Sequence, residues 1–219
     1  MKYIFLHGLG QTAESWEKTV RVAELGADVL CPDLSAWLFA CEPTYAKLYE
    51  AFEAYCGRFE EPLCLCGLSL GGVLALHYAI GHGARVSGLV LMGTPVSMPR
   101  AMLKLQNIAF RLMPEAAFRG AGFDKRGMIS LCSSMTELDF RRELSRVGCR
   151  TLIMCGEKDR ANRAASLELK RGIPRAKLSV ISGAGHEVNV DNPAEVGEKL
   201  KRFFRETHAA AVIAAGREV

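Results

Sequence analysis

The chain has 219 residues, of which 49% are hydrophobic and 24% are charged, and its formal net charge is +4. This balance is typical of one globular domain, 1–219, with enough apolar material for a core. No dense run of Lys and Arg favours nucleic-acid binding, and no stretch reaches the ~18 apolar residues of a membrane-spanning helix. We therefore expect no nucleic-acid partner and no membrane insertion.

Strand-like and helix-like segments alternate along the chain. We expect strands at 2–6, 28–31, 63–66, 86–92, 151–155 and 177–181. We expect helices at 16–24 (ended by Gly26), 44–59 (begun by Thr44), 70–81, 162–171 and 193–204. This alternation predicts a mostly parallel sheet of about six strands with helices on both faces.

Residues 97–146 interrupt this alternation with apolar residues at helical spacing and no strand signal. They predict a small helical cap that packs on the active-site end of the sheet and lines an apolar pocket. The apolar tail at 209–215 is too short to span a membrane, so we expect it to dock or fray.

Four of the eight cysteines lie in apolar strand-like runs, where cysteine behaves as a small hydrophobic residue. Cys64 and Cys66 are too close together for a usual zinc knuckle. Reduced thiols predict a cytoplasmic protein. We expect no metal or organic cofactor.

Gly67-Leu68-Ser69-Leu70-Gly71 fits the G-x-S-x-G nucleophile elbow. The chain must reverse sharply between a buried strand and a helix, and glycines remove the Cβ atoms that would collide there. The turn holds Ser69 at a helix N-terminus, which favours developing negative charge.

Two further polar residues follow predicted strands. Asp159 follows 151–155 and His186 follows 177–181. Carboxyl ends of parallel strands meet at one edge of a sheet, where active sites of such folds lie. The order Ser69, Asp159, His186 therefore predicts a nucleophile, an acid and a base at one site.

With these motifs the chain resembles the α/β-hydrolase superfamily over nearly its whole length. The matching segments are His7-Gly8-Leu9-Gly10 with Trp16, the elbow 67–72, the acid strand 152–159, and Gly183-Ala184-Gly185-His186 followed by Asn192-Pro193 and the helix ending at Phe203-Phe204. Two departures indicate a reduced version: no antiparallel hairpin precedes 2–6, and the segment after Pro32-Asp33-Leu34-Ser35 is short.

The resemblance implies that Ser69 attacks an acyl carbonyl, that His186 transfers its proton, and that Asp159 orients His186. It also implies that the N–H groups of Leu9 and Leu70 form the oxyanion hole. For the substrate pocket we expect Trp16, Thr94, Val96, Met98, Met102 and Val188.

Other polar residues have simpler explanations. Asp33 is expected in a turn or cap, Asp191 at a helix start, and Asp139 in solvent or as a capping group. His7 is expected to hold the oxyanion loop by hydrogen bonding. His77 and His82 are expected to be packed or at the surface.

The resulting hypothesis is a carboxylesterase-like or thioesterase-like serine hydrolase (EC 3.1) acting on a small to medium apolar acyl compound. A C–C hydrolase, lactonase, lyase or acyltransferase would use the same residues, since one fold hosts many chemistries. A non-catalytic ligand-binding or sensor protein is the remote alternative. The expected partner is a small-molecule acyl substrate. The sequence does not indicate whether the protein is a monomer or an oligomer.

Overall fold

A computed structural model describes residues 1–39, 41–98, 100–118, 120 and 122–215. Its centre is a six-stranded sheet in the order β2-β1-β3-β4-β5-β6, and every strand pair is parallel. The strands are β1 (Lys2–Leu6), β2 (Val29–Leu30), β3 (Leu63–Leu68), β4 (Val86–Met92), β5 (Arg150–Gly156) and β6 (Ala176–Ile181). The predicted parallel α/β sheet is confirmed.

The strand order reverses between β1 and β3. From β1 the chain moves outward to β2, and it then crosses back to β3 on the other side of β1. At such a switch point the loops after the two strands diverge, which leaves a crevice at their carboxyl ends. The loop that starts at His7 and the turn at Ser69 both lie there.

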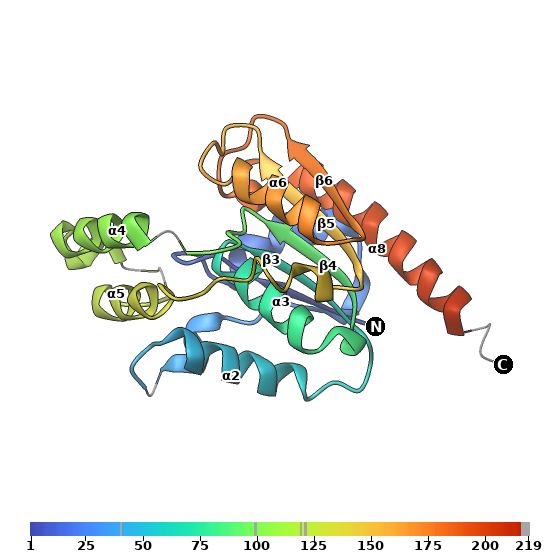
Figure 1. Cartoon of the computed structure of the whole chain (residues 1–219), viewed down its shortest axis with the longest axis horizontal. Coiled ribbons are helices and arrows are strands. Elements are labelled where there is room, and N and C mark those ends of the chain that lie inside the picture. Colours follow the sequence, from blue (N-terminus) through green and yellow to red (C-terminus); the bar gives the residue numbers. More distant parts are fainter. Residues whose placement is uncertain (40, 99, 119, 121, 216–219) are drawn as a thin grey trace.

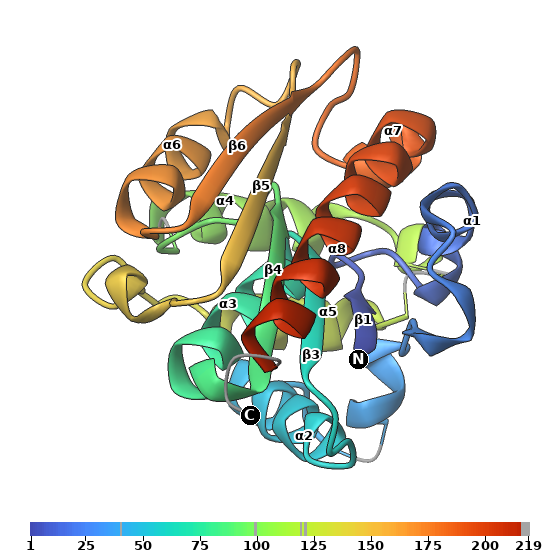
Figure 2. The ribbon, with the colours of Figure 1, turned by 90° about the vertical axis from the view of Figure 1, so that its right-hand side faces the viewer.

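Helices cover both faces of the sheet (Figures 1 and 2). One face carries α1 (Glu17–Ala23), α7 (Val188–Asp191) and α8 (Pro193–Ala215), and the other carries α2 (Tyr45–Cys56), α3 (Leu70–Gly81) and α6 (Arg163–Gly172). Glu24, with a φ of 50°, ends α1, rather than the predicted Gly26. The residues 209–215 are neither docked nor frayed but form the last turns of α8, which projects from the body in Figure 1.

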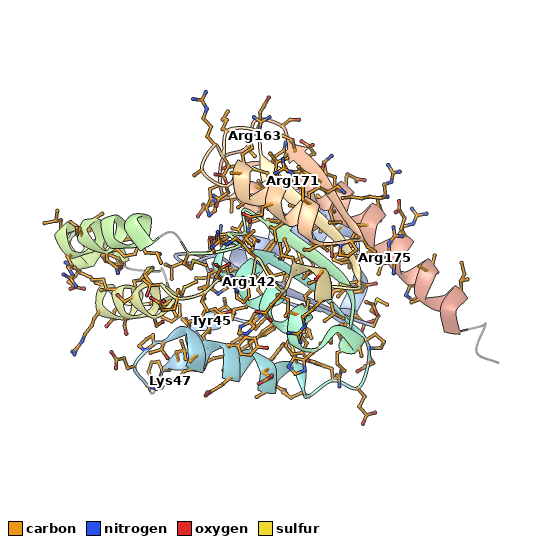
Figure 3. All side chains as sticks on the ribbon, in the orientation of Figure 1. Tyr45, Lys47, Arg142, Arg163, Arg171 and Arg175 are labelled. Atoms are coloured by element: carbon orange, nitrogen blue, oxygen red, sulfur yellow. The ribbon has the colours of Figure 1, made fainter. Side chains whose placement is uncertain are left out.

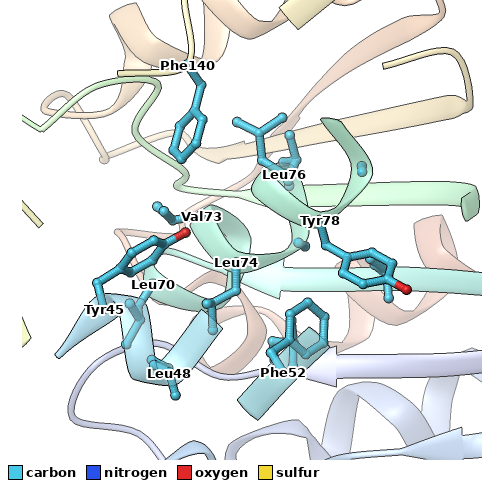
Figure 4. Packing of buried hydrophobic residues seen from close by; sticks show 14 of the residues in the cluster. Tyr45, Leu48, Phe52, Leu70, Val73, Leu74, Leu76, Tyr78 and Phe140 are labelled. Atoms are coloured by element: carbon cyan, nitrogen blue, oxygen red, sulfur yellow. The ribbon is translucent and has the colours of Figure 1, made fainter. Parts of the chain in front are cut away.

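Helix α3 fixes the position of the candidate nucleophile because it is buried almost all round. Figure 4 shows its Leu70 and Leu74 among α2 side chains that include Leu48 and Phe52. Thr44 begins α2 as predicted, since its side chain accepts a hydrogen bond from Lys47 N–H.

Residues 97–146, here called the cap, contain α4 (Arg100–Leu112) and α5 (Lys125–Ser134). Figure 1 places both helices beyond the carboxyl ends of the strands. The two ends of the cap are joined by an isolated antiparallel bridge between Ser97 and Asp139. Tyr45, labelled in Figure 3, lies at the end of α2 nearest α5, and its N–H donates to Ser134 Oγ at 2.8 Å.

None of the helices in the described part of the chain is long and apolar enough to cross a membrane.

Candidate active site

Ser69 occupies a strained turn between β3 and α3. Its φ of 50° and ψ of −111° lie outside the regions that L-residues favour. Its N–H donates to Met92 O at 2.8 Å, which ties the turn to β4. A Cβ atom added to Gly67 would lie 2.3 Å from Gly71 C, and one added to Gly71 would lie 2.1 Å from Leu6 O. The glycines therefore allow β1, β3 and α3 to meet at van der Waals contact under Ser69.

Asp159 and His186 form a hydrogen-bonded pair at the ends of β5 and β6. Their Oδ2 and Nδ1 atoms are 2.9 Å apart. The Asp159 side chain is buried, whereas that of His186 is partly exposed. Because Nδ1 donates to the carboxylate, Nε2 of His186 is left without a proton and can accept one from a hydroxyl group.

The loop that carries His186 is fixed by backbone contacts. A Cβ atom on Gly156 would lie 1.9 Å from Gly185 O, so only glycine allows this loop to sit on the end of β5. Asp191 Oδ2 accepts from Gly185 N–H at 2.7 Å. Asp191 therefore braces the His186 loop and ends the short helix α7, and the expectation that it begins a helix is wrong.

Gly93, at the end of β4, provides the surface against which the imidazole rests. Its φ is +52°, and an added Cβ atom would lie 2.9 Å from both Cε1 and Nδ1 of His186. Any side chain at Gly93 would therefore displace the ring.

Asn162 is a member of this cluster that the sequence did not reveal. Its Nδ2 lies 3.0 Å from each carboxylate oxygen of Asp159 and 3.1 Å from Nδ1 of His186. Since Nδ1 already donates to Asp159, the Asn162 amide acts as a second donor to the same carboxylate. Asn162 thus holds the Asp159 side chain in the orientation that receives His186.

The loop after β1 is held by a buried histidine. His7 Nε2 accepts from Leu34 N–H at 3.0 Å, so the proton is on Nδ1, which donates to Gly8 O at 2.9 Å. Burial lowers the pKa of His7 and keeps the ring neutral. This hydrogen-bonding role is the one predicted for His7.

A pair of buried amides joins this loop to the segment after His186. Gly8 N–H donates to Gln11 Oε1, and Gln11 Nε2 donates to Asn189 Oδ1 on α7, both at 3.3 Å. Asn189 Nδ2 returns a hydrogen bond to Gln11 Oε1 at 3.4 Å. The loop after β1 and the loop of His186 are thus parts of one hydrogen-bonded unit.

These groups meet at a cavity of about 480 Å³. Ser69, His186 and Asn162 line it together with Leu9 and Leu70, the two predicted oxyanion residues. Leu70 is the first residue of α3, and the first N–H groups of a helix have no partner within it. The remaining lining is mostly apolar and includes Met98, Leu103, Phe110, Met113, Phe118, Met128, Cys132 and Met135.

The substrate-pocket residues predicted from the sequence have different locations. Met98 lines the cavity. Trp16, Thr94, Val96 and Val188 are buried and are not among its lining residues. Trp16 packs edge-on against Phe5 on the face of the sheet that α1 and α8 cover. Thr94 Oγ1 donates to Met92 O. The side chain of Met102 lies outside the described part of the structure.

The remaining polar residues have structural partners. Asp33 accepts from Ser35 N–H at the start of a short helical turn. His77 stacks on Tyr49 with ring centroids 3.9 Å apart. His82 pairs with Glu53, and Asp139 pairs with Arg141. Among the residues that the structure describes, no group of three or more His, Cys, Asp or Glu side chains could hold a metal ion.

The structure combines a parallel sheet, helices on both of its faces and a serine in a strained turn after the third strand. These features define the class of α/β hydrolase folds. The chain belongs to the alpha/beta hydrolase family, whose model matches residues 3–199.

Known relatives share the whole fold. A putative 2-succinyl-6-hydroxy-2,4-cyclohexadiene-1-carboxylate synthase of Bacillus subtilis (strain 168) is 22% identical and covers 92% of this chain and 89% of its own. The enol-lactonase of Burkholderia xenovorans LB400 superposes with a TM-score of 0.81 at 19% identity, over 93% of this chain and 90% of its own. NosK from Streptomyces actuosus superposes with a TM-score of 0.80 at 25% identity, over 94% of this chain and 98% of its own.

Proposed function

We propose that the protein is a serine hydrolase that cleaves a carboxylic ester or thioester of a small to medium apolar acyl group. The observation that carries the proposal is the 2.9 Å hydrogen bond between His186 Nδ1 and Asp159, in a cavity that Ser69 also lines. This arrangement supports a role for His186 Nε2 as proton acceptor in the cavity that Ser69 lines.

The proposed reaction has two halves. Ser69 Oγ attacks the acyl carbonyl while His186 Nε2 takes the hydroxyl proton, and the N–H groups of Leu9 and Leu70 stabilise the oxyanion. His186 then gives its proton to the departing alcohol or thiol. Water attacks the acyl-enzyme with His186 again as base, which releases the carboxylic acid and restores Ser69.

The cavity lining supports an uncharged acyl group. Its described residues include no Lys, Arg, Asp or Glu, and they include four methionines and two phenylalanines. An anionic acyl chain would lose its hydration there without gaining a partner. An apolar chain is stabilised by about 25 cal/mol for each Å² that it buries.

The second candidate is a C–C hydrolase, lactonase, lyase or acyltransferase that uses the same residues. The similarity to a synthase favours this candidate. The name of that synthase includes a carboxylate. The absence of a cationic side chain from the described lining here favours the neutral ester instead. A non-catalytic sensor remains the third candidate.

A panel of p-nitrophenyl esters from acetate to decanoate, run beside lactones, β-diketones and acyl acceptors, tests the proposal. We expect hydrolysis that rises from acetate to medium chains. Turnover of the lactones, diketones or acceptors alone would replace the ester assignment with the second candidate. A ligand that stabilises the protein without being consumed would support the sensor.

The free thiols support the proposal that the protein works in the cytoplasm.

A further inference from the structure

The chain's net charge is concentrated in the cap. Residues 100–126 contain six Lys or Arg and two acidic residues, which gives +4, so the 22 basic and 22 acidic residues elsewhere cancel. An even distribution would leave the cap nearly neutral. The excess of positive charge therefore lies in the cap, which borders the candidate site.

The same end exposes large apolar side chains. On α4, Ile108 is 54% exposed and Leu112 is 82% exposed, and their spacing of four places them on one side of the helix. Met113, which is 39% exposed, also lines the cavity. The exposed apolar patch formed by these three residues is thus continuous with the cavity mouth.

Basic groups border this apolar patch. Arg111 is exposed between Ile108 and Leu112. Lys125 Nζ donates to Arg111 O at 2.8 Å and to Met113 O at 2.7 Å, which brings its charge to the carboxyl end of α4. Exposed leucine and isoleucine with adjacent lysine and arginine is the pattern of a helix that lies in a membrane interface.

We propose that the cap docks on an anionic lipid surface, with Ile108 and Leu112 among the acyl chains and Arg111 and Lys125 against the headgroups. Charge complementarity selects this occupant, since a second copy would bring two faces of like charge together. The inference goes beyond the proposed hydrolysis. It implies that an apolar substrate passes from the lipid layer past Met113 into the cavity.

Co-sedimentation with phosphatidylcholine vesicles, made with and without phosphatidylglycerol, tests this docking. We expect binding to the anionic vesicles that weakens as salt rises. The double change Ile108→Asp/Leu112→Asp should weaken binding about tenfold or more, because both apolar contacts are lost. Arg111→Gln should weaken it about fivefold, on anionic vesicles only.

The matched control lies at the other end of the molecule (Figure 1). Val212 and Ile213 on α8 are 59% and 58% exposed, so they resemble the tested pair in type and exposure. Val212→Asp/Ile213→Asp should leave vesicle binding unchanged. Helical content and thermal unfolding of the Ile108→Asp/Leu112→Asp protein should match those of the wild type, which excludes misfolding as the cause of lost binding.

Three outcomes would overturn the docking. They are equal binding to both vesicle types, equal loss in the Val212→Asp/Ile213→Asp control, and dimerisation that Ile108→Asp/Leu112→Asp abolishes while vesicle binding persists. The binding assay needs no turnover, so the Ser69→Ala protein serves equally well. Failure of docking is therefore distinguishable from failure of the proposed hydrolysis.

Discussion

The carboxyl edge of the sheet and the cap differ in how closely their backbones approach other atoms. At the edge, a Cβ atom on Gly67, Gly71 or Gly156 would lie within 2.3 Å of backbone atoms. In the cap, a Cβ atom on Gly120 would meet nothing within 4 Å. The edge is therefore specified by backbone contact, and the candidate catalytic groups sit on it.

The cap instead contributes side chains. Much of the cavity wall consists of apolar cap side chains, several of them flexible methionines: Met113, Phe118, Met128 and Met135. We expect that such residues can be exchanged without disturbing the strand ends. In the proposed hydrolase, the candidate reactive groups are thus held by close backbone contacts, and the cavity wall that would select the substrate comes largely from the cap.

The largest expected difference between the two regions is in stability. Gly71→Ala places a methyl group against Leu6 O and should lower the free energy of unfolding by more than about 3 kcal/mol. Gly120→Ala, at a φ of +80° in open space, should cost about 1 kcal/mol of backbone strain. Urea unfolding followed by tryptophan fluorescence measures both. Equal losses would contradict the contrast.

The next effect is on catalysis. Gly93→Ala forces the His186 ring away from its position, and a displacement of this size should reduce kcat about a hundredfold. Gly26→Ala is the matched control, because its φ of +73° imposes similar strain and nothing lies within 4 Å. Equal loss of activity in the two variants, at equal thermal stability, would contradict the role of Gly93 in positioning His186.

A cap substitution should change selectivity rather than chemistry. Met128 is buried in the cavity wall near the loop after β1, so Met128→Ala should raise kcat/KM for a longer acyl chain about tenfold relative to a short one. Met113→Ala, at the exposed mouth, should change the ratio less. A uniform loss on all chain lengths would show that Met128 supports the reactive groups instead.

The smallest expected effect concerns pH and folding. Burial lowers the pKa of His7 below its ordinary 6.5, so below that pH the unfolded chain binds a proton that the folded chain does not. Stability is therefore lost as pH falls from 6.5 toward the lowered pKa. Between pH 7.5 and 5.5, the free energy of unfolding of His7→Gln should fall by about 1 kcal/mol less than that of the wild type. An unchanged pH dependence would mean that His7 titrates normally.

Long apolar runs and turn motifs predicted most of the fold. β4 matches its prediction at both ends because a Val-rich and Leu-rich run follows Arg85 and is closed by Gly93-Thr94-Pro95. The four-residue helix α7 is too short to show a period. The Ala-rich residues 209–215 are strong helix formers, and that signal could have extended α8.

The candidate site was predictable only in part. Ser69, Asp159 and His186 follow strands whose ends meet at one edge. Asn162 has no motif, because its role depends on a side-chain distance to Asp159. The sequence near a motif does not reveal which face of the sheet a residue joins. Trp16 therefore does not line the cavity as predicted, and it packs against Phe5 instead.

Labelling with a fluorophosphonate tests the nucleophile most directly, because the reagent bonds covalently to an activated serine hydroxyl. Intact mass spectrometry followed by peptide mapping should show one adduct per chain, on Ser69, with loss of ester hydrolysis. Ser69→Ala should keep its thermal stability, take up no label and lose at least about 10⁴-fold in kcat. An unlabelled wild type, or a Ser69→Ala protein that hydrolyses esters at near wild-type rate, would contradict the account.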